Sequence, residues 1–267
     1  MPRANRHFLP GQIWHITHRC HQKAFLLKFA RDRRLYVRWL FEAKKRFGLC
    51  VLNYTVTSNH IHLLVRDTAP EVISKSIQLI AGRTGRDYNQ RKSRKGAYWE
   101  DRYHATAVEA DEHLRRCLVY IDLNMVRAGA VKHPAEWAHG GYQEIQAPPK
   151  RYAIIGLAVL SELSGCTTVA EFQKGHREWV DDAHRAGIGG RDERWSEALA
   201  VGSQAYLDKI KAALGGRAFH RQIAEANGIH TLREPAVSYT RRFEGKNMPL
   251  SPDNARFWRD SLNAIEA

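Results

Sequence analysis

The chain has 267 residues, of which 43% are hydrophobic and 10% aromatic, so it can form a packed core and is not a disordered chain. No uninterrupted apolar run approaches about 18 residues, so we expect neither a transmembrane helix nor a membrane partner. The first stretch, MPRANRHFLPGQ, is basic and lacks the apolar region of a secretory signal. The 4 cysteines form no CxxC pair, which favours reduced thiols and a cytoplasmic protein.

The positive charge is concentrated in the first part of the chain. The net charge of +14 comes from 42 Lys/Arg and 28 Asp/Glu. Residues 1–150 carry 26 of these basic and 13 of these acidic residues, a net charge of +13, and residues 151–267 carry 16 and 15, a net charge of +1. This asymmetry favours a nucleic-acid-binding N-terminal domain, although basic surfaces without such a role also occur.

Alternating β-formers predict strands, and apolar residues at helical spacing predict helices. In chain order, the predicted elements are strand 11–20, helix 31–47, strands 49–57 and 60–65, helix 71–90, strand 105–109 and helix 111–127. The first helix has a basic outer face and should end at Gly48. The first six elements predict an α+β, ferredoxin-like (split βαβ) fold, with an antiparallel sheet, two helices on one face and a further helix added at the end.

The composition changes after QAPPKRY, residues 146–152, so we place a domain boundary between residues 147 and 148. Residues 1–147 would be the functional domain, and 148–267 a mostly helical extension of unknown role. Helices are expected over 153–163, 168–186 and 203–214. The stretch 221–232 faintly resembles a helix-turn-helix, although Pro235 would shorten its second helix.

The segment HIHLLV places His60 and His62 on one face of a strand, because strand side chains alternate with period two. Such a pair is often structural, but these histidines open the strand directly after a polar turn. An apolar tail behind them would hold the strand rigid. A metal site would need a further ligand from another part of the chain.

The predicted helix 111–127 provides two polar side chains four residues apart, and hence on one helical face. Tyr120 offers a phenol and Asn124 a neutral carbonyl oxygen, with Asp111 as a candidate N-cap. The buried stripe would consist of Leu114, Cys117, Leu118, Ile121 and Met125. Alternatively, Tyr120 lies at a rim and Asn124 points to water.

Two imidazoles, a carboxamide and a tyrosine beside a basic surface suggest phosphodiester chemistry. A divalent metal can polarise the phosphodiester, and a tyrosine oxygen can attack the phosphorus to form a covalent intermediate. The 3′ oxygen would leave, and the 5′ phosphate would stay on the tyrosine.

Four stretches together resemble the HUH-type single-tyrosine transposases, an IS200-like superfamily, and particularly the REP-associated tyrosine transposases. They are NHIHLLV, the downstream YIDLNMVRAGAV, the first strand GQIWHITHRC and the segment GAYWEDRYHATAVEADEHL. The resemblance covers about residues 11–145.

The resemblance implies that the protein is a tyrosine transposase, which cleaves and transfers DNA strands. His60 and His62 match the paired metal ligands, Tyr120 the nucleophile and Asn124 the residue that completes the metal site. The implied metal is Mg²⁺ or Mn²⁺, and the implied substrate is single-stranded DNA next to a hairpin. Met125 stands where the family commonly has Pro, so the helix should continue regularly past Asn124.

Basic residues between the second helix and the following strand are candidates for DNA binding. They are Arg83, Arg86, Arg91, Lys92, Arg94, Lys95 and Arg102. Tyr88, Tyr98 and Trp99 could stack on bases, or could instead belong to the core beneath a solvated basic loop. His15 and His18 are expected to be structural or to contact phosphate.

Two other functions remain open from the sequence. A domesticated protein could bind hairpin DNA or RNA without turnover, although the four site residues speak against it. A zinc-dependent RNase is weaker, because no carboxylate base is evident near His60 or His62. The leading interpretation predicts a nucleoid-associated cytoplasmic enzyme, in which Tyr120 could act within its own subunit or in a homodimer.

Overall fold

The computed structural model describes residues 9–187, 192–218, 221–226 and 228–233. The chain up to Glu234 forms one compact unit. Its strands are β1 (Ile13–Arg19), β2 (Cys50–Val56), β3 (His60–Arg66), β4 (His104–Val108), β5 (Ala200–Gly202), β6 (Gln222–Ala226) and β7 (Ile229–Arg233). Its α-helices are α1 (Ala30–Phe47), α2 (Val72–Arg91), α3 (Glu112–Asp122), α4 (Asn124–Arg127), α5 (Tyr142–Gln146), α6 (Leu157–Leu163), α7 (Val169–Arg185), α8 (Arg194–Glu197) and α9 (Gln204–Leu214).

The first four strands confirm the predicted ferredoxin-like α+β fold. They lie in the order β2-β3-β1-β4, and each neighbouring pair is antiparallel. In this register His62 lies opposite Thr17 of β1 and Thr55 of β2. Residues directly opposite each other share a face of the sheet, so polar side chains from three strands gather on the His62 face.

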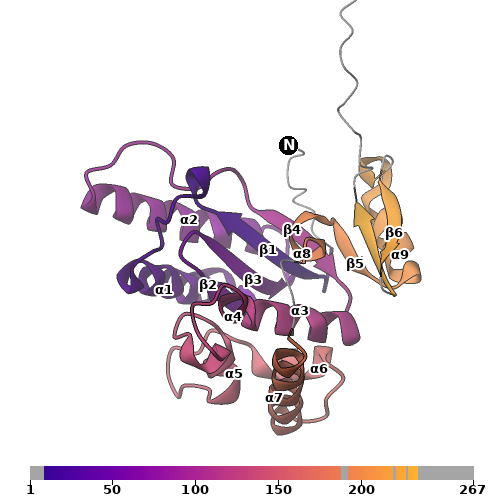
Figure 1. Cartoon of the computed structure of the whole chain (residues 1–267). Helices are drawn as coiled ribbons and strands as arrows, with labels where there is room; N and C mark the ends of the chain where they lie inside the picture. The colour runs from indigo at the N-terminus through magenta and orange to yellow at the C-terminus, as the bar shows by residue number, and fades with distance from the viewer. Residues whose placement is uncertain (1–8, 188–191, 219–220, 227, 234–267) are drawn as a thin grey trace, which may run out of the picture. The chain divides into compact units, whose positions relative to one another are not determined.

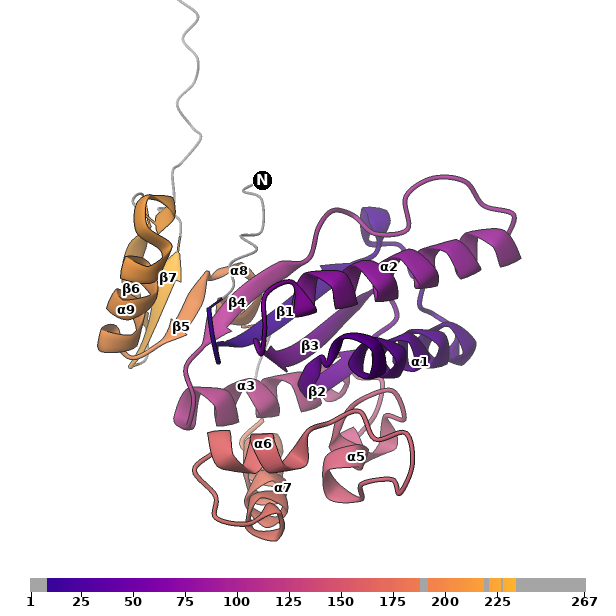
Figure 2. The same ribbon diagram turned by 180° about the vertical axis from the view of Figure 1, so that it is seen from behind.

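The two faces of this sheet carry different helices. Helices α1 and α2 pack against each other on one face, and α3 lies across the other (Figures 1 and 2). Thr55 Oγ1 donates to the backbone carbonyl of Ile121 in α3 at 3.1 Å, which places α3 on the His62 face. Ile61 and Leu63 alternate to the opposite face and are fully buried. Helix α1 ends as predicted, at Gly48, whose φ of 71° is left-handed.

The tyrosine helix departs from the prediction of one regular helix over 111–127. Helix α3 ends at Asp122 and α4 begins at Asn124, with Leu123 at φ −76° and ψ 1° between them. Side-chain hydrogen bonds hold Asp122 and Asn124 to the sheet on either side of this break. Asp111 stands at the predicted N-cap position, but it has φ 58° and its side chain makes no capping hydrogen bond. The predicted buried stripe is confirmed for all five of its residues.

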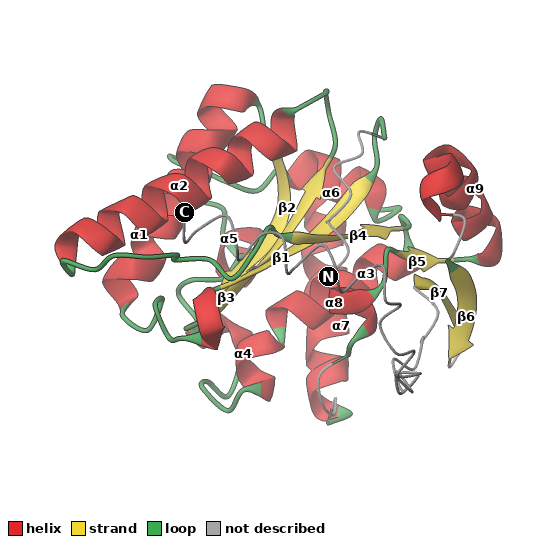
Figure 3. Cartoon of the chain, turned by 90° about the horizontal axis from the view of Figure 1, so that it is seen from above, coloured by secondary structure: helices red, strands yellow, loops and turns green. Residues whose placement is uncertain are grey.

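The boundary predicted after residue 147 does not separate compact units. Strand β5 pairs in parallel with β4, with Ala107 opposite Ala200, and so joins the extension to the sheet of the first domain. The full order is β2-β3-β1-β4-β5-β7-β6 (Figure 3). The helix-turn-helix prediction is also wrong, because β6 and β7 form an antiparallel pair there. Gly228, with φ 70°, permits their tight turn.

Two of the predicted helices of the extension are found close to their expected bounds, as α7 and α9. The helix expected over 153–163 begins only at Leu157, because Ile155 bridges to Val51 of β2. The stretch after Pro235 lies outside the described residues. No helix in the described part of the chain is both long enough and apolar enough to cross a bilayer.

The outer edge of β2 is covered by a later part of the same chain. His139 O accepts from Val56 N at 2.9 Å, and Gly141 N donates to Tyr54 O at 2.8 Å. Further along, Gly156 N donates to the carbonyl of Val51 at 2.9 Å. Backbone groups that an edge strand would otherwise present to solvent are therefore paired within the chain.

Candidate active site

Two histidine rings converge at the start of β3. The Nε2 atoms of His60 and His62 lie 3.1 Å apart, on the shared face that their alternation predicts. His62 is buried and His60 is half-buried. Thr57 shapes the turn before them, because its Oγ1 accepts the backbone N–H of His60 at 3.1 Å. The rings therefore leave a rigid strand at its first and third residues.

The hydrogen-bond partners of His60 determine which ring nitrogen carries the proton. Asn59 Nδ2 donates to the carbonyl of Lys23 at 3.1 Å, and this orients Asn59 Oδ1 toward the ring. That oxygen lies 2.7 Å from His60 Nδ1. A carboxamide oxygen can only accept, so Nδ1 carries the proton. Nε2 of His60 therefore presents a lone pair toward His62.

A second chain of contacts determines the tautomer of His62. His15 Nδ1 lies 2.8 Å from the carbonyl oxygen of Trp195, which can only accept, so Nδ1 donates. Burial lowers the pKa of His15 to about 3, despite the bond to Trp195, so the ring is neutral. Its Nε2 then accepts from His62 Nδ1 at 3.0 Å. Nε2 of His62 is thereby left as a second lone pair.

These two lone pairs fit a cation. They face each other at 3.1 Å, and two acceptors form no hydrogen bond. Imidazole nitrogens at this spacing can both reach one divalent ion at about 2.1 Å. Asn124 Nδ2 lies 3.0 Å from His62 Nε2, and half a turn of the carboxamide brings its oxygen there instead. In the described ranges no group of three or more His, Cys, Asp or Glu could hold a metal, so the third ligand would be Asn124.

Tyr120 completes the group of four predicted side chains within a single chain. Its ring lies edge-on to His62, with the ring centroids 5.6 Å apart. The guanidinium carbon of Arg127 lies 4.3 Å from the Tyr120 ring centroid, and the ring of Trp195 lies 6.1 Å away. Tyr120 is 8% exposed. The predicted nucleophile and the predicted metal ligands therefore meet without a partner subunit.

Sequence reasoning missed Arg127, although its spacing was a signal. It follows Tyr120 by seven residues, about two helical turns, and Asn124 by three. Arg127 also donates to the backbone carbonyl of Tyr120 at 2.6 Å. Burial lowers the pKa of Arg127, and the neighbouring Tyr120 offsets only part of this shift. A cation beside a phenol favours its phenolate form.

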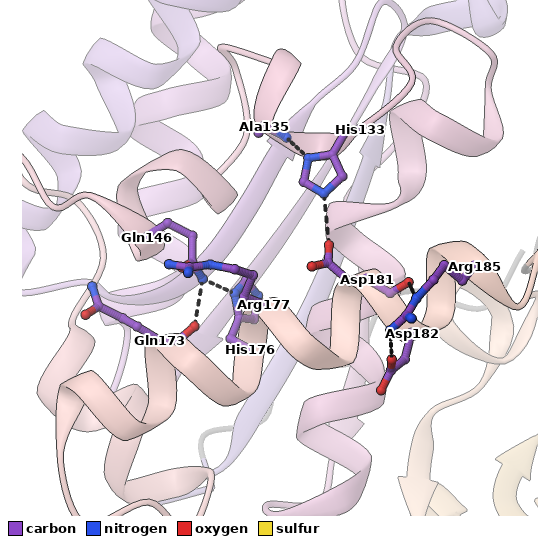
Figure 4. A network of polar contacts seen from close by, with 9 residues as sticks. All are labelled: His133, Ala135, Gln146, Gln173, His176, Arg177, Asp181, Asp182 and Arg185. Atoms are coloured by element: carbon purple, nitrogen blue, oxygen red, sulfur yellow. Dashed lines mark hydrogen bonds and ion pairs between the residues drawn. The ribbon is translucent and has the colours of Figure 1, made fainter.

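Asp122, between Tyr120 and Asn124 in sequence, joins α3 to both the sheet and the extension. Asn53 Nδ2 donates to its Oδ1 at 3.0 Å, and His176 Nε2 of α7 lies 2.8 Å from its Oδ2. Figure 4 shows Gln146 beside His176 and Arg177. The oxygen of the Gln146 carboxamide accepts from Arg177, and its Nε2 lies 3.0 Å from Nδ1 of His176. Nδ1 of His176 therefore accepts, and Nε2 of His176 donates to the Asp122 carboxylate.

The predicted DNA-binding residues fall into two groups. Five are exposed, namely Arg83, Arg86, Lys92, Lys95 and Arg102. The other two have partners within the chain, because Arg91 pairs with the buried Asp32, and Arg94 donates to Asn89 Oδ1 at 3.0 Å. Of the aromatic residues beside them, Tyr98 is buried, and Trp99 stacks on His18 with ring centroids 4.1 Å apart.

Two further features near these residues had weak sequence signals. A groove between α1 and α2 is lined by Arg31, Arg34, Leu35, Arg38, Asp87 and Arg91. Its three α1 arginines share the basic face predicted for that helix. Phe25 and Phe29, 65% and 56% exposed, precede α1, and the ammonium of Lys92 lies 5.8 Å from the Phe29 ring.

Comparison with known proteins points to one family. Residues 11–124 match the family model described as transposase IS200 like. One solved structure, of a REP-associated tyrosine transposase bound to a REP hairpin, has 17% identity and a TM-score of 0.47, with 55% of this chain and 87% of that chain covered. Another, described as a transposase from Deinococcus radiodurans R1, has 16% identity and a TM-score of 0.32, with 44% and 92% covered. No curated protein sequence matches the chain. The matched segment contains both histidines, Tyr120 and Asn124, so the similarity to the IS200-like transposases includes all four predicted site residues.

Proposed function

We propose that the protein is a metal-dependent transposase and endonuclease that cleaves and rejoins single-stranded DNA next to hairpins, through a 5′-phosphotyrosine on Tyr120. One observation carries this proposal. The Nε2 atoms of His60 and His62 converge at 3.1 Å, Asn124 lies 3.0 Å from His62, and the Tyr120 ring packs on His62, all within one chain. The match of residues 11–124 to the IS200-like transposase family model supports the same activity.

The metal would be Mg²⁺ or Mn²⁺, held by His60, His62 and Asn124. When bound, such an ion stabilises negative charge on the phosphoryl oxygens of the DNA. Mg²⁺ prefers oxygen ligands, whereas imidazole suits transition metals, so a site with two imidazoles should bind Mn²⁺ more tightly than Mg²⁺.

The protein's own residues would make and break the covalent bonds. The Tyr120 oxygen attacks the phosphorus as its proton leaves, and Arg127 beside the ring stabilises the developing phenolate. The new bond joins phosphorus to the tyrosine oxygen, the bond from phosphorus to the 3′ oxygen breaks, and the 3′ oxygen takes up, by way of solvent, the proton that the tyrosine lost and leaves as a hydroxyl. Rejoining reverses this exchange, because a 3′ hydroxyl attacks the phosphotyrosine and Tyr120 departs.

DNA would be held by the exposed basic residues and by the arginines of the groove between α1 and α2. Phosphates would be neutralised by Arg83, Arg86, Lys92, Lys95 and Arg102. Arg91 and Arg94 would contribute positive charge beside them while bonded to Asp32 and Asn89. Exposed Phe25 and Phe29 would stack on unpaired bases. Such a substrate implies work at the nucleoid in the cytoplasm, and a homodimer could engage two hairpins.

The test is covalent capture of DNA. We expect the full chain, incubated with Mn²⁺ and an end-labelled single strand that contains a hairpin, to form a labelled protein adduct on a denaturing gel. Tyr120→Phe should form no adduct and bind the hairpin nearly as well as the wild type. Tyr142→Phe, at a buried tyrosine outside the site, is the matched control and should keep the adduct. Cleavage by Tyr120→Phe at the wild-type rate would refute the mechanism.

A non-catalytic hairpin-binding protein is the second candidate. The observation in its favour is the burial of Tyr120, which is 8% exposed and covered by Arg127 and Trp195. The same experiment separates the two, because salt-sensitive binding with no adduct from the wild-type protein would establish this second function.

A further inference from the structure

We infer that the C-terminal extension is part of the catalytic site, because the backbone carbonyl of Trp195 positions the metal ligand His62 through His15. This inference rests on the proposed role of His62. Trp195 lies far outside the segment that matches the transposase family, residues 11–124. The active site therefore depends on a part of the chain that the family match does not include.

The contact between the two imidazoles has the geometry of a directed hydrogen bond. His15 Nε2 and His62 Nδ1 are 3.0 Å apart, and the ring planes differ by 7°. The ring centroids, however, are 5.1 Å apart. Rings stacked face to face would bring their centroids closer, so these rings lie edge to edge, nearly in one plane. An in-plane N–H of His62 then points at the lone pair of His15.

The carbonyl that orients His15 is itself held in place. Trp195 is 2% exposed, and its ring centroid lies 6.4 Å from that of His15 and 6.1 Å from that of Tyr120. Thr106 Oγ1 of β4 donates to Ala198 O at 2.8 Å. Next along the chain, Leu199 O accepts from Ala107 N at 2.8 Å, where β5 begins to pair with β4. The extension thus enters the sheet directly beside the site.

Loss of this chain of contacts would remove a metal-binding lone pair, and would not merely make the position of His62 less precise. The alternative tautomer of His62 carries its proton on Nε2, where it would donate to His60 Nε2 across the 3.1 Å gap. The two histidines would then be hydrogen-bonded to each other, and neither Nε2 atom would be available to a metal ion. The acceptor on His15 prevents this, because it keeps the proton of His62 on Nδ1. His15 is therefore a positioning residue, and its side chain is fully buried.

Metal affinity tests the inference without reference to activity. We expect His15→Phe, which keeps a flat ring but removes the acceptor, to weaken Mn²⁺ binding about 10- to 100-fold, measured from free Mn²⁺ by electron paramagnetic resonance. His15→Gln, whose carboxamide oxygen can accept from His62, should recover most of the affinity. Wild-type affinity in His15→Phe would overturn the inference.

His62→Ala separates this inference from the proposed function. If His62→Ala binds Mn²⁺ as tightly as the wild type, the proposed metal site is wrong. If His62→Ala loses binding and His15→Phe does not, only the inference fails. Should His15→Phe not fold, the metal-free wild-type protein still decides by nitrogen-15 NMR of its histidine rings. A proton on Nδ1 of both His15 and His62 is expected, and a proton on His62 Nε2 would overturn the inference.

Discussion

Replacing Asp122 by Asn should strongly destabilise the protein, because both of its oxygens accept hydrogen bonds in a buried environment. The side chain is 1% exposed, and it accepts from Asn53 at 3.0 Å and from His176 at 2.8 Å. An Asn side chain offers one acceptor and places an N–H against the other donor. His176 cannot adapt by changing tautomer, because Gln146 already donates to its Nδ1.

The expected loss of unfolding free energy is about 2–5 kcal/mol, because a neutral His176 donates this hydrogen bond to a buried carboxylate. It combines about 1–3 kcal/mol for the unsatisfied buried donor with the loss of a charge-assisted hydrogen bond. Urea denaturation followed by circular dichroism measures the change, and the slope with urea should stay the same. Asp122 adjoins the break between α3 and α4, so adduct formation through Tyr120 should also fall in molecules that remain folded.

Asp181→Asn is the matched control for Asp122→Asn. Asp181 on α7 also faces a histidine, His133, at 3.2 Å, but its side chain is 43% exposed (Figure 4). Water screens this pair, so the expected loss is below about 1 kcal/mol. Equal losses in the two variants, or a loss below about 1 kcal/mol in Asp122→Asn, would refute the role assigned to the buried contacts.

Three further predictions concern other parts of the fold. Gly141→Ala should lose about 1–3 kcal/mol of unfolding free energy in urea denaturation, because the new methyl group would overlap Asn53 Oδ1. Gly82→Ala in α2 has open space around it and should gain about 0.5–1 kcal/mol. Burial lowers the pKa of His18 from 6.5 to about 4, so the unfolded state takes up a proton first and stability falls as the pH drops from about 6.5 to 4. At pH 5 this one group lowers the unfolding free energy by about 2 kcal/mol. His18→Gln should remove that amount from the difference in unfolding free energy between pH 7 and pH 5. Arg127→Gln should slow adduct formation at least about tenfold in single-turnover assays with hairpin binding unchanged, and an unchanged rate would exclude Arg127 from the chemistry.

The part of the fold that the sequence predicted well consists of elements with strong local periodicity. The strand that carries His60 and His62 alternates clearly, and helix α1 has a regular apolar stripe and a terminal glycine, Gly48. Tyr120 and Asn124 were selected from their helical spacing together with family resemblance, and both side chains lie beside His62. Local pattern sufficed for this strand and for α1, whereas the spacing from Tyr120 to Asn124 spans the break between α3 and α4.

The features that were not predicted from the sequence depend on contacts between distant segments of the chain. His15 is held by a backbone carbonyl 180 residues further along the chain, and a carbonyl has no sequence signature. Strand β5 is three residues long and owes its conformation to β4, so periodicity could not reveal it. The break at Leu123 follows from side chains on either side that bond to the sheet. The continuous helix predicted from Met125 in place of Pro is therefore wrong.

The arrangement at the two edges of the four-strand core limits how two copies of the chain could associate. Residues 139–156 occupy the outer side of β2, and β5 occupies the outer side of β4. Among the described strands, addition between copies would then have to use β6, the last strand in the order, which stands five positions from β3. At about 4.8 Å per strand, that edge lies about 24 Å from the histidines. The histidine pairs of two copies joined in this way would therefore lie far apart.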